Sequence, residues 1–347
     1  MKLFQYVSAG VLALGCALYT VPTQAQAIET PTHRFEKIAD GVYFAVGTGS
    51  VYVMSNAMVV IGDTDVLVVD SHVTPTAARA LLESIKSITD KPVRYLVNTH
   101  YHFDHAHGNQ AFPDGVEIIG HEYTREKLLG PVLQEDTFLS FTTPLPAQIE
   151  DLKNRIAQQT DPDRKAALQA RLKVQEDYLE ANAEIIPTPP NITLRTEMSL
   201  YMGDREIRLL HLGRGHTGGD VVVFLPAERL IFTGDLMLPF LSYMGDGFVD
   251  EWPATLEALK QLDFDVLLPG HGATLRDKAF IGHIQGYLKD IWKRASEAKA
   301  KGLSAEEASG QIDMTDHAGN IQRITGPGVD PRAVRRIYQR LDAQTER

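Results

Sequence analysis

The alternation of apolar and polar residues divides the first part of the chain into short strands and one helix. A helical pattern covers residues 74–88, with Thr74 as the expected N-cap and Pro75 as the first helical residue. Glycine- and aspartate-containing turns separate the strands on either side of it. This strand–helix–strand order is typical of an α/β protein. The predicted strands cover residues 41–47, 51–62, 65–72, 92–100 and 115–122.

Residues 131–190 interrupt this order and predict a helical insertion. Two helical stretches, Ile149–Gln159 and Pro162–Ala183, meet near Asp161, which is a good helix start before proline. The second stretch has a single stripe of less polar positions, at Leu168, Leu172, Gln175 and Leu179. A solvated hairpin that packs through one edge, a lid over a site, and a dimer contact all fit this pattern, and the oligomeric state stays open.

Strands return after residue 190, at 192–213, 220–235 and 266–272, with a helix expected at 253–262. A mostly helical C-terminal extension covers residues 278–347, and Asp330-Pro331 opens its last helix. The chain therefore contains two similar β halves with helices outside them.

The first 27 residues have the pattern of a secretory signal peptide. Lys2 supplies the positive charge, an apolar run follows from Leu3 to Leu18, and Ala25-Gln26-Ala27 is a small-x-small cleavage site. A membrane anchor is the weaker alternative, because the run is short for a span and contains glycine and serine. We expect a mature chain of residues 28–347 that is periplasmic or secreted and has no stable membrane insertion.

The cysteine count and the net charge limit the kinds of catalysis, metal ligands and partners that the mature chain could have. The only cysteine, Cys16, lies in the expected signal peptide, so the mature chain would have no cysteine nucleophile, cysteine metal ligand or disulfide. The net charge of −11 is dispersed along the chain, which argues against binding to nucleic acid or to an anionic membrane. A small molecule is the expected partner.

Histidines and aspartates gather at the predicted strand ends. His100, His102, Asp104 and His105 follow one strand within six residues. Imidazole and carboxylate groups in one turn are the ligands that suit Zn²⁺. Later strand ends add further candidates beside glycines, which allow the sharp turns that bring ligands together. These are His216 in GHTGGD, Asp235 in TGD and His271 in PGHG.

Together with Asp70 in VVDSH, these motifs resemble, in type and order, those of the metallo-β-lactamase superfamily over residues 35–275. The resemblance implies a four-layer αβ/βα metallo-β-lactamase sandwich, here with a helical insertion, and a site at one edge. It also implies two Zn²⁺ ions, with iron or manganese as alternatives. The implied ligands are His100, His102 and His216 for the first ion, Asp104, His105 and His271 for the second, and Asp235 as the bridge.

The resemblance also implies a reaction. A hydroxide shared by the two metals would attack a carbonyl carbon, because metal-bound water has a pKa near 7. Asp104 is the expected catalytic residue, steadying the nucleophile and the leaving group beside the second metal. Thr217 and Asp70 are candidates for orienting the ligands.

Asp235 narrows the expected substrate. Zinc β-lactamases of the superfamily usually carry Cys or Ser at this position, whereas a bridging aspartate is the pattern of hydroxyacylglutathione hydrolases, lactonases and related esterases. We therefore expect a hydrolase of a lactone, ester or thioester, with β-lactam hydrolysis as a main or side activity. The alternatives are an iron-dependent redox enzyme, a nuclease, which the acidic balance disfavours, and a non-catalytic periplasmic metal-binding module.

Two further features leave alternatives open. Residues 47–56 predict either a mobile flap over the metals, with Val51, Tyr52 and Met54 as apolar contacts, or an ordinary hairpin. His107 is expected either to border the pocket or to face water, and His121 to lie either behind the ligands or at the rim. The remaining histidines are expected to be structural: His33, His72, His211, His283 and His317.

Overall fold

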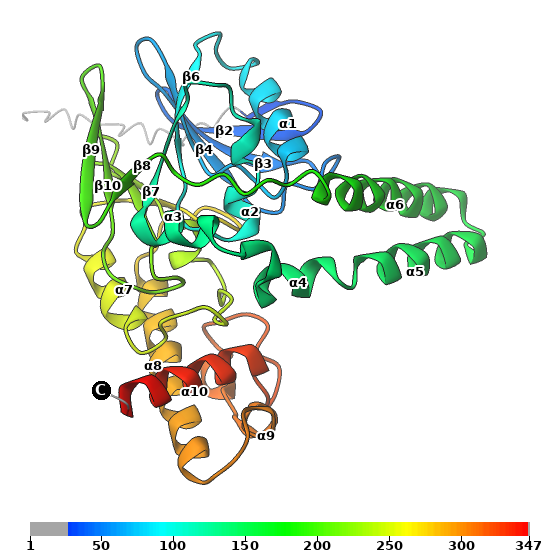
Figure 1. Cartoon of the computed structure of the whole chain (residues 1–347), viewed down its shortest axis with the longest axis vertical. Coiled ribbons are helices and arrows are strands. Elements are labelled where there is room, and N and C mark those ends of the chain that lie inside the picture. The colour runs from blue at the N-terminus through cyan, green and yellow to red at the C-terminus, as the bar shows by residue number, and fades with distance from the viewer. Residues whose placement is uncertain (1–26, 346–347) are drawn as a thin grey trace, which may run out of the picture.

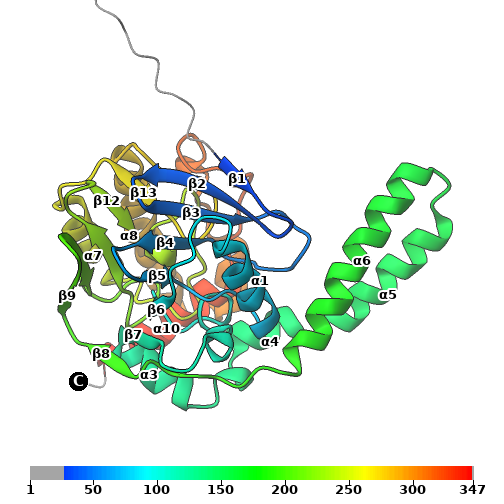
Figure 2. The same cartoon turned by 90° about the horizontal axis from the view of Figure 1, so that it is seen from above.

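Two β-sheets face each other at the centre of the molecule (Figures 1 and 2), in a computed structural model that describes residues 27–345. The expected signal peptide and Cys16 lie outside the described residues, apart from Ala27. The first sheet contains β1 (Ala27–Glu29), β2 (His33–Ala39), β3 (Val42–Gly47), β4 (Ala57–Ile61), β5 (Val66–Val69), β6 (Val93–Val97), β7 (Glu117–His121) and β8 (Ile192–Leu194). The second contains β9 (Glu197–Met202), β10 (Arg205–Leu210), β11 (Val222–Leu225), β12 (Leu230–Phe232) and β13 (Val266–Leu268).

The central strands β4, β5, β11 and β12 bury both of their faces. In β4, Met58 and Val60 point into the core between the sheets, whereas Ala57 and Val59 point into the core on the outer face. Successive side chains of a strand point to opposite faces, so a strand covered on both sides needs a continuous apolar run. The chain supplies such a run, and the sheet forms there.

Helices cover the outer face of each sheet. Helix α1 (Pro75–Ile85) packs on the first sheet through Leu81 and Ile85. Helices α7 (Trp252–Lys260) and α8 (Ala279–Ala300) pack on the second. The order of layers is therefore helix, sheet, sheet, helix, which confirms the predicted αβ/βα sandwich. No helix within residues 27–345 is long and apolar enough to cross a membrane.

The helix predictions are largely confirmed. Thr74 caps α1 by accepting a hydrogen bond from the amide of Ala77, at 3.1 Å. The C-terminal region contains α9 (Ala305–Gln311) and α10 (Pro331–Thr345). Short helical segments complete the chain: α2 (Phe103–Ala106), α3 (Glu122–Leu129), η1 (Asn109–Ala111), η2 (Val132–Gln134), η3 (Gly234–Leu236) and η4 (Thr315–His317).

The residues between β7 and β8 contain the predicted helical hairpin. Helix α4 (Asp136–Thr142) leads into α5 (Leu145–Gln158) and α6 (Pro162–Asn182), and the last two extend side by side away from the body (Figures 1 and 2). Asp161 caps α6 as expected. The predicted stripe is wrong at its end, because Tyr178 is buried while Leu179 stays 39% exposed.

The strand predicted over residues 51–62 is wrong in its first half, because β4 begins only at Ala57. Met54 has a left-handed backbone with φ of 65°, which a strand does not allow. The amide of Asn56 donates to the carbonyl of Gly270 at 2.7 Å instead of to a neighbouring strand. Residues 51–56 therefore form an irregular segment that contacts the loop after β13.

Candidate metal centre

The topology brings the predicted ligands to one edge of the sandwich. Strands β5 and β6 run parallel, as do β12 and β13, so the loops after each pair leave at the same edge. Two backbone hydrogen bonds hold neighbouring loops together at this edge, from Val221 N, just before β11, to Thr99 O and from Gly270 N to Gly234 O, both 2.8 Å. Backbone contacts therefore form this edge independently of the ligand side chains.

All seven predicted ligands converge there. Their ligand atoms form three groups within which every atom lies within 4.8 Å of the others. Six of the seven side chains are buried and His271 is half-buried, which is typical of a closed centre. The groups are His100, His102 and His216; His100, His105 and Asp235; and Asp104, His105 and His271.

Asp235 lies between the first and last groups. Its Oδ2 is 3.8 Å from Nε2 of His216 and 3.3 Å from Nε2 of His271. Its Oδ1 is 3.3 Å from Nε2 of His105. One carboxylate therefore reaches both clusters, as a bridging ligand must.

Each ligand histidine turns one ring nitrogen outward to a protein acceptor. His216 Nδ1 donates to the carbonyl of Tyr243 at 3.0 Å, and His271 Nδ1 donates to the carbonyl of Met54 at 3.1 Å. His102 Nε2 donates to Asp246 at 3.1 Å. Such partners fix which nitrogen carries the proton and leave the lone pair of the other nitrogen for a metal.

Asp70 orients two more of these rings, as predicted. It accepts from His105 Nδ1 at 2.7 Å and from the amide and hydroxyl of Thr99. The Thr99 oxygen in turn accepts from His100 Nδ1 at 3.0 Å. Asp70 has a left-handed backbone, with φ of 65°, directly after β5, a strained conformation of the kind that occurs at functional sites.

The inward atoms fit a cation. His102 Nδ1 and His216 Nε2 lie 2.9 Å apart, yet both rings use their proton outward, so two lone pairs face each other. His100 Nε2 and Asp235 Oδ1 are buried without a hydrogen-bond partner among residues 27–345. Buried polar atoms are rarely left unpaired, and imidazole with carboxylate is the donor set of zinc. The arrangement therefore fits two metal ions.

The electrostatics of the two clusters differ. Burial lowers the pKa of His216 to about 3 and that of His100 well below its usual value, so both rings are neutral. Burial also disfavours charge on His271, but Asp235 and Asp104 outweigh it and raise its pKa to about 10. Metal ligands must be deprotonated, so a cation in the second cluster would replace protons there.

Two glycines make the close packing possible. A Cβ on Gly270 would lie 2.3 Å from Asp235 Oδ1, and one on Gly234 would lie 2.5 Å from Thr99 Oγ1. Gly234 also has a φ of +52°, which side chains rarely adopt. The TGD and PGHG motifs thus require glycine beside their ligands.

The sequence patterns did not predict a role at the metal centre for Asp246, Tyr243 or Thr137. Asp246 accepts from His102 and also from the hydroxyl of Thr137, which belongs to α4. A hydrogen-bonded path therefore runs from the helical insertion to a predicted ligand. The only sequence signal was an acidic residue between glycines in MGDG, at residues 244–247.

Other predicted positions have structural roles. Thr217 donates to Asp220 at 2.6 Å, and burial raises the pKa of Asp220 to about 7. His121 caps α3 by accepting from the amide of Tyr123. The expectation that His107 borders a pocket or faces water is wrong: helix α4 covers it, Phe138 packs 5.2 Å from its ring, and it is 1% exposed.

The helical insertion closes one side of the centre. Tyr52, in the segment predicted as a flap, packs against Tyr178 of α6 with ring centroids 4.4 Å apart. Phe141 of α4 packs against Phe103, which lies between the ligands His102 and Asp104. Residues 51–54 are therefore packed between the ligand loops and the insertion rather than forming an ordinary hairpin.

The groups that could hold metal ions thus converge at the loop edge of an αβ/βα sandwich. The sequence profile of the metallo-beta-lactamase superfamily matches residues 51–271, more than half of the chain. The chain belongs to this superfamily.

Similar proteins include several hydrolases. The linear primary-alkylsulfatase of Pseudomonas sp. (strain ATCC 19151) is 23% identical over 79% of this chain and 53% of its own length. The metallo-beta-lactamase type 2 of Bacillus sp. (strain 170) is 28% identical over 28% of this chain and 39% of its own. The chain thus spans about half or less of the length of these curated relatives.

A solved structure, the sec-alkylsulfatase Pisa1 from Pseudomonas sp., resembles this chain with a TM-score of 0.63 at 16% sequence identity. The match covers 88% of this chain and 50% of that chain. At this identity the likeness establishes the fold.

Proposed function

We propose that the protein is a two-metal hydrolase that cleaves an ester, lactone or thioester of a small molecule, with β-lactams as further substrates. The observation that carries this proposal is the convergence of seven imidazole and carboxylate groups, with Asp235 reaching both clusters. Zinc is the proposed metal, because three imidazoles form one cluster and mixed imidazole and carboxylate groups form the other. Iron or manganese would fit the second cluster as well.

The metal ions would lower the pKa of water and polarise the oxygen of the scissile bond. The chain's own groups fix the geometry. Asp104 Oδ2 lies 3.0 Å from His271 Nε2, and its carboxylate is 6% exposed, so it is held in place at the second cluster. We propose Asp104 as the residue that orients the attacking and leaving oxygens.

Sulfate-ester hydrolysis is the second candidate. The alkylsulfatase match extends over 79% of this chain, against 28% for the Bacillus metallo-beta-lactamase. The longer match favours a shared arrangement beyond the ligand motifs. Substrate comparison decides between the two candidates.

The test follows hydrolysis by the zinc-loaded protein of a lactone, a glutathione thioester, a carbapenem and an alkyl sulfate. Turnover of the first two is expected to exceed the rest and to fall to background in His102→Ala. The matched control is His283→Ala, because His283 lies on α8 outside the ligand groups.

Each of the other outcomes of this test would indicate a different function. Turnover of the alkyl sulfate alone would replace the proposal with its second candidate. A protein that purifies with iron and consumes oxygen would indicate a redox enzyme. A fully loaded centre that hydrolyses none of the four substrates would support a non-catalytic metal-binding module.

We also propose that the protein is exported, on the signal-like pattern of residues 1–27. Cell fractionation of the full chain, with N-terminal sequencing, is expected to find a periplasmic or secreted form that begins at Ile28. A form retained in the cytoplasm with its original N-terminus would contradict this.

A further inference from the structure

A cavity of about 540 Å³ lies between α4, α5, α6 and the start of α10. Small-molecule sites usually have a volume of this order. Its wall combines three aromatic rings, those of Tyr52, Phe141 and Tyr178, with the side chains of Arg171 and Arg332. Every one of these residues lies outside the ligand motifs.

Three residues of the cavity wall contact or adjoin residues next to the metal centre. Phe141 packs against Phe103, between two predicted ligands, at a centroid distance of 5.2 Å. The guanidinium of Arg332 lies 4.9 Å from the ring of Tyr243, whose carbonyl holds His216. Tyr52 lies two residues before Met54, whose carbonyl holds His271. A molecule in the cavity therefore borders the supports of both clusters.

Tyr52 lines the cavity together with Arg171. Burial raises the pKa of Tyr52 most, the Asp104 carboxylate raises it further, and the Arg171 guanidinium lowers it. The hydroxyl of Tyr52 therefore responds to charges of both the metal centre and the cavity wall.

The charge of the wall is unusual for this chain, which has 45 acidic and 34 basic residues. Among residues 27–345, no aspartate or glutamate lines this cavity. Within the same residues, no carboxylate lies within 4.0 Å of a side-chain nitrogen of Arg171. The buried oxygen atoms Gln175 Oε1 and Tyr178 Oη also lack hydrogen-bond partners in the part of the chain that the structure describes. Arg171 thus offers a positive charge that no carboxylate of the described residues pairs with, whereas Arg332 is paired with Asp330.

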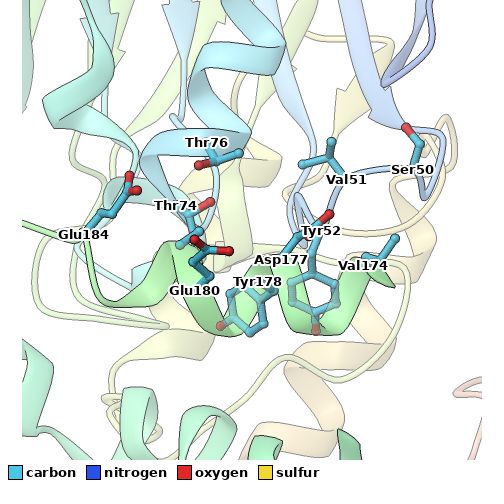
Figure 3. Close-up of a pocket in the computed structure, with 11 residues that line it drawn as sticks. Ser50, Val51, Tyr52, Thr74, Thr76, Val174, Asp177, Tyr178, Glu180 and Glu184 are labelled. Carbon is cyan, nitrogen blue, oxygen red and sulfur yellow. The ribbon is translucent and has the colours of Figure 1, made fainter. Parts of the chain in front are cut away.

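The opposite side of the Tyr52–Tyr178 pair is a useful contrast. A smaller cavity of about 220 Å³ lies there, and Figure 3 shows the carboxylates of Asp177, Glu180 and Glu184 around it. An anion would be repelled from that side. The aromatic pair therefore separates an acidic cavity from a basic one, and the basic one borders the metal centre.

Arg332 is fixed in advance. Asp330 holds its guanidinium at 2.8 Å, and the ring of Tyr243 lies beneath it. A guanidinium that is already oriented loses little freedom when it binds an anion, and it forms paired hydrogen bonds with carboxylate or sulfate oxygens. The aromatic wall would contact the apolar part of the same molecule.

We propose that this cavity binds substrates that join an apolar body to an anionic group, and that Arg171 and Arg332 bind that group away from the scissile bond. The inference rests on the proposed hydrolase function and names its substrate class. A carboxylate or a sulfonate would present the same oxygens, so both are tested as probes.

The test measures binding by calorimetry to the zinc-loaded full chain. The probes are octanoate, octane-1-sulfonate, octan-1-ol and octyltrimethylammonium. Both anions are expected to bind at least about tenfold more tightly than the alcohol and the cation, because hydrogen bonds from a guanidinium to an anion are stronger than those between neutral groups. Preference for one anion over the other identifies the natural head group.

The variants are Arg171→Gln and Arg332→Gln, with metal content measured in each. Both are expected to lose the preference for anions while keeping their metal. Arg332→Lys keeps the charge and should keep part of the preference. The matched control is Arg164→Gln, which removes a charge from the same helix outside the cavity. Equal binding of all four probes, or an equal loss in Arg164→Gln, would overturn the proposal.

Kinetics separate this inference from the proposed function. Esters of matched length that end in carboxylate or in methyl are expected to differ in KM rather than kcat, and Arg171→Gln should remove the difference. Hydrolysis without any effect of the end group would overturn the inference and leave the function standing. Anion binding that depends on Arg171, without hydrolysis of any ester, would overturn the function and leave the binding site standing.

Discussion

The ligand loops and the helical insertion enclose the same centre but are built in different ways. The ligand loops follow buried strands, and backbone hydrogen bonds and close contacts at glycines hold them against each other. The insertion, α4 to α6, rests on the body through a small cluster that includes Phe138, Leu145 and Tyr178. Strand ends therefore specify the chemistry, and the loosely attached helices are free to specify the substrate.

The first way to test this contrast is to weaken the support beneath the ligand loops. His33 is fully buried, and its Nε2 lies 3.1 Å from Nε2 of His72. His72 pairs with Ser55, which donates to the backbone carbonyl of Asp104 at 2.6 Å. Burial lowers the pKa of His33 to about 4.

Acid is therefore expected to destabilise the fold through His33. The ordinary histidine pKa is about 6.5, so between pH 6.5 and 4 the unfolded chain binds more protons than the folded one. The contribution of His33 to the free energy of unfolding is fully present above pH 6.5. It is lost as the pH drops towards 4, and the loss is on the order of 3 kcal/mol. Urea unfolding at several pH values should show a flatter decline in His33→Asn than in the wild type. An unchanged decline, or an equal flattening in His283→Asn, would refute the role of His33.

The second test concerns the link between the two regions. Asp246 joins Thr137 of α4 to the ligand His102. Replacing a residue that orients a metal ligand typically costs about 10- to 100-fold in metal affinity. We expect a loss of this size in Asp246→Ala, a smaller loss in Asp246→Asn, and the smallest loss in Thr137→Val, measured by chelator competition.

A double-mutant cycle identifies the path. If Thr137 acts through Asp246, Thr137→Val should have no further effect in the Asp246→Ala background. Asp250→Ala is the control, because Asp250 lies in the same loop but pairs with Arg340 instead of with a ligand. Additive losses would mean that the insertion affects the metal by another route.

The contrast also explains what the sequence could predict. The ligands His100 to His105 occupy one turn after one strand, so their spacing alone places them together. Asp70, Asp235 and His271 follow strands that the apolar pattern identifies. The hydrogen-bond partners of His216 and His271 could not be predicted in this way. They are the backbone carbonyls of Tyr243 and Met54, and every residue type has such a carbonyl.

The sequence predicts the helices of the insertion but not which of their side chains face the body. The predicted apolar stripe ends at Leu179. In the structure Tyr178 is buried instead and packs against Tyr52, which lies 126 residues earlier in the chain. Helix α6 is polar around most of its circumference, so periodicity gives little guidance to its contact face. A tertiary partner decides the orientation, and a single sequence does not name that partner.

The smallest expected effect concerns this aromatic contact. Aromatic pairs contribute about 0.5–1.5 kcal/mol beyond their buried area. Tyr52→Ala should therefore raise KM for any ester that the wild type hydrolyses, by at most about tenfold, with kcat and metal content unchanged. The control is Tyr201→Ala, because Tyr201 is 69% exposed on β9.

The result of this substitution decides where the boundary between the two regions lies. Tyr52 packs on the insertion, but the carbonyl of Met54, two residues later, holds His271. A change in KM alone would assign residues 51–54 to the substrate side of the centre. Loss of metal from Tyr52→Ala would instead assign them to the ligand loops, because the backbone at Met54 would then depend on the Tyr52–Tyr178 contact.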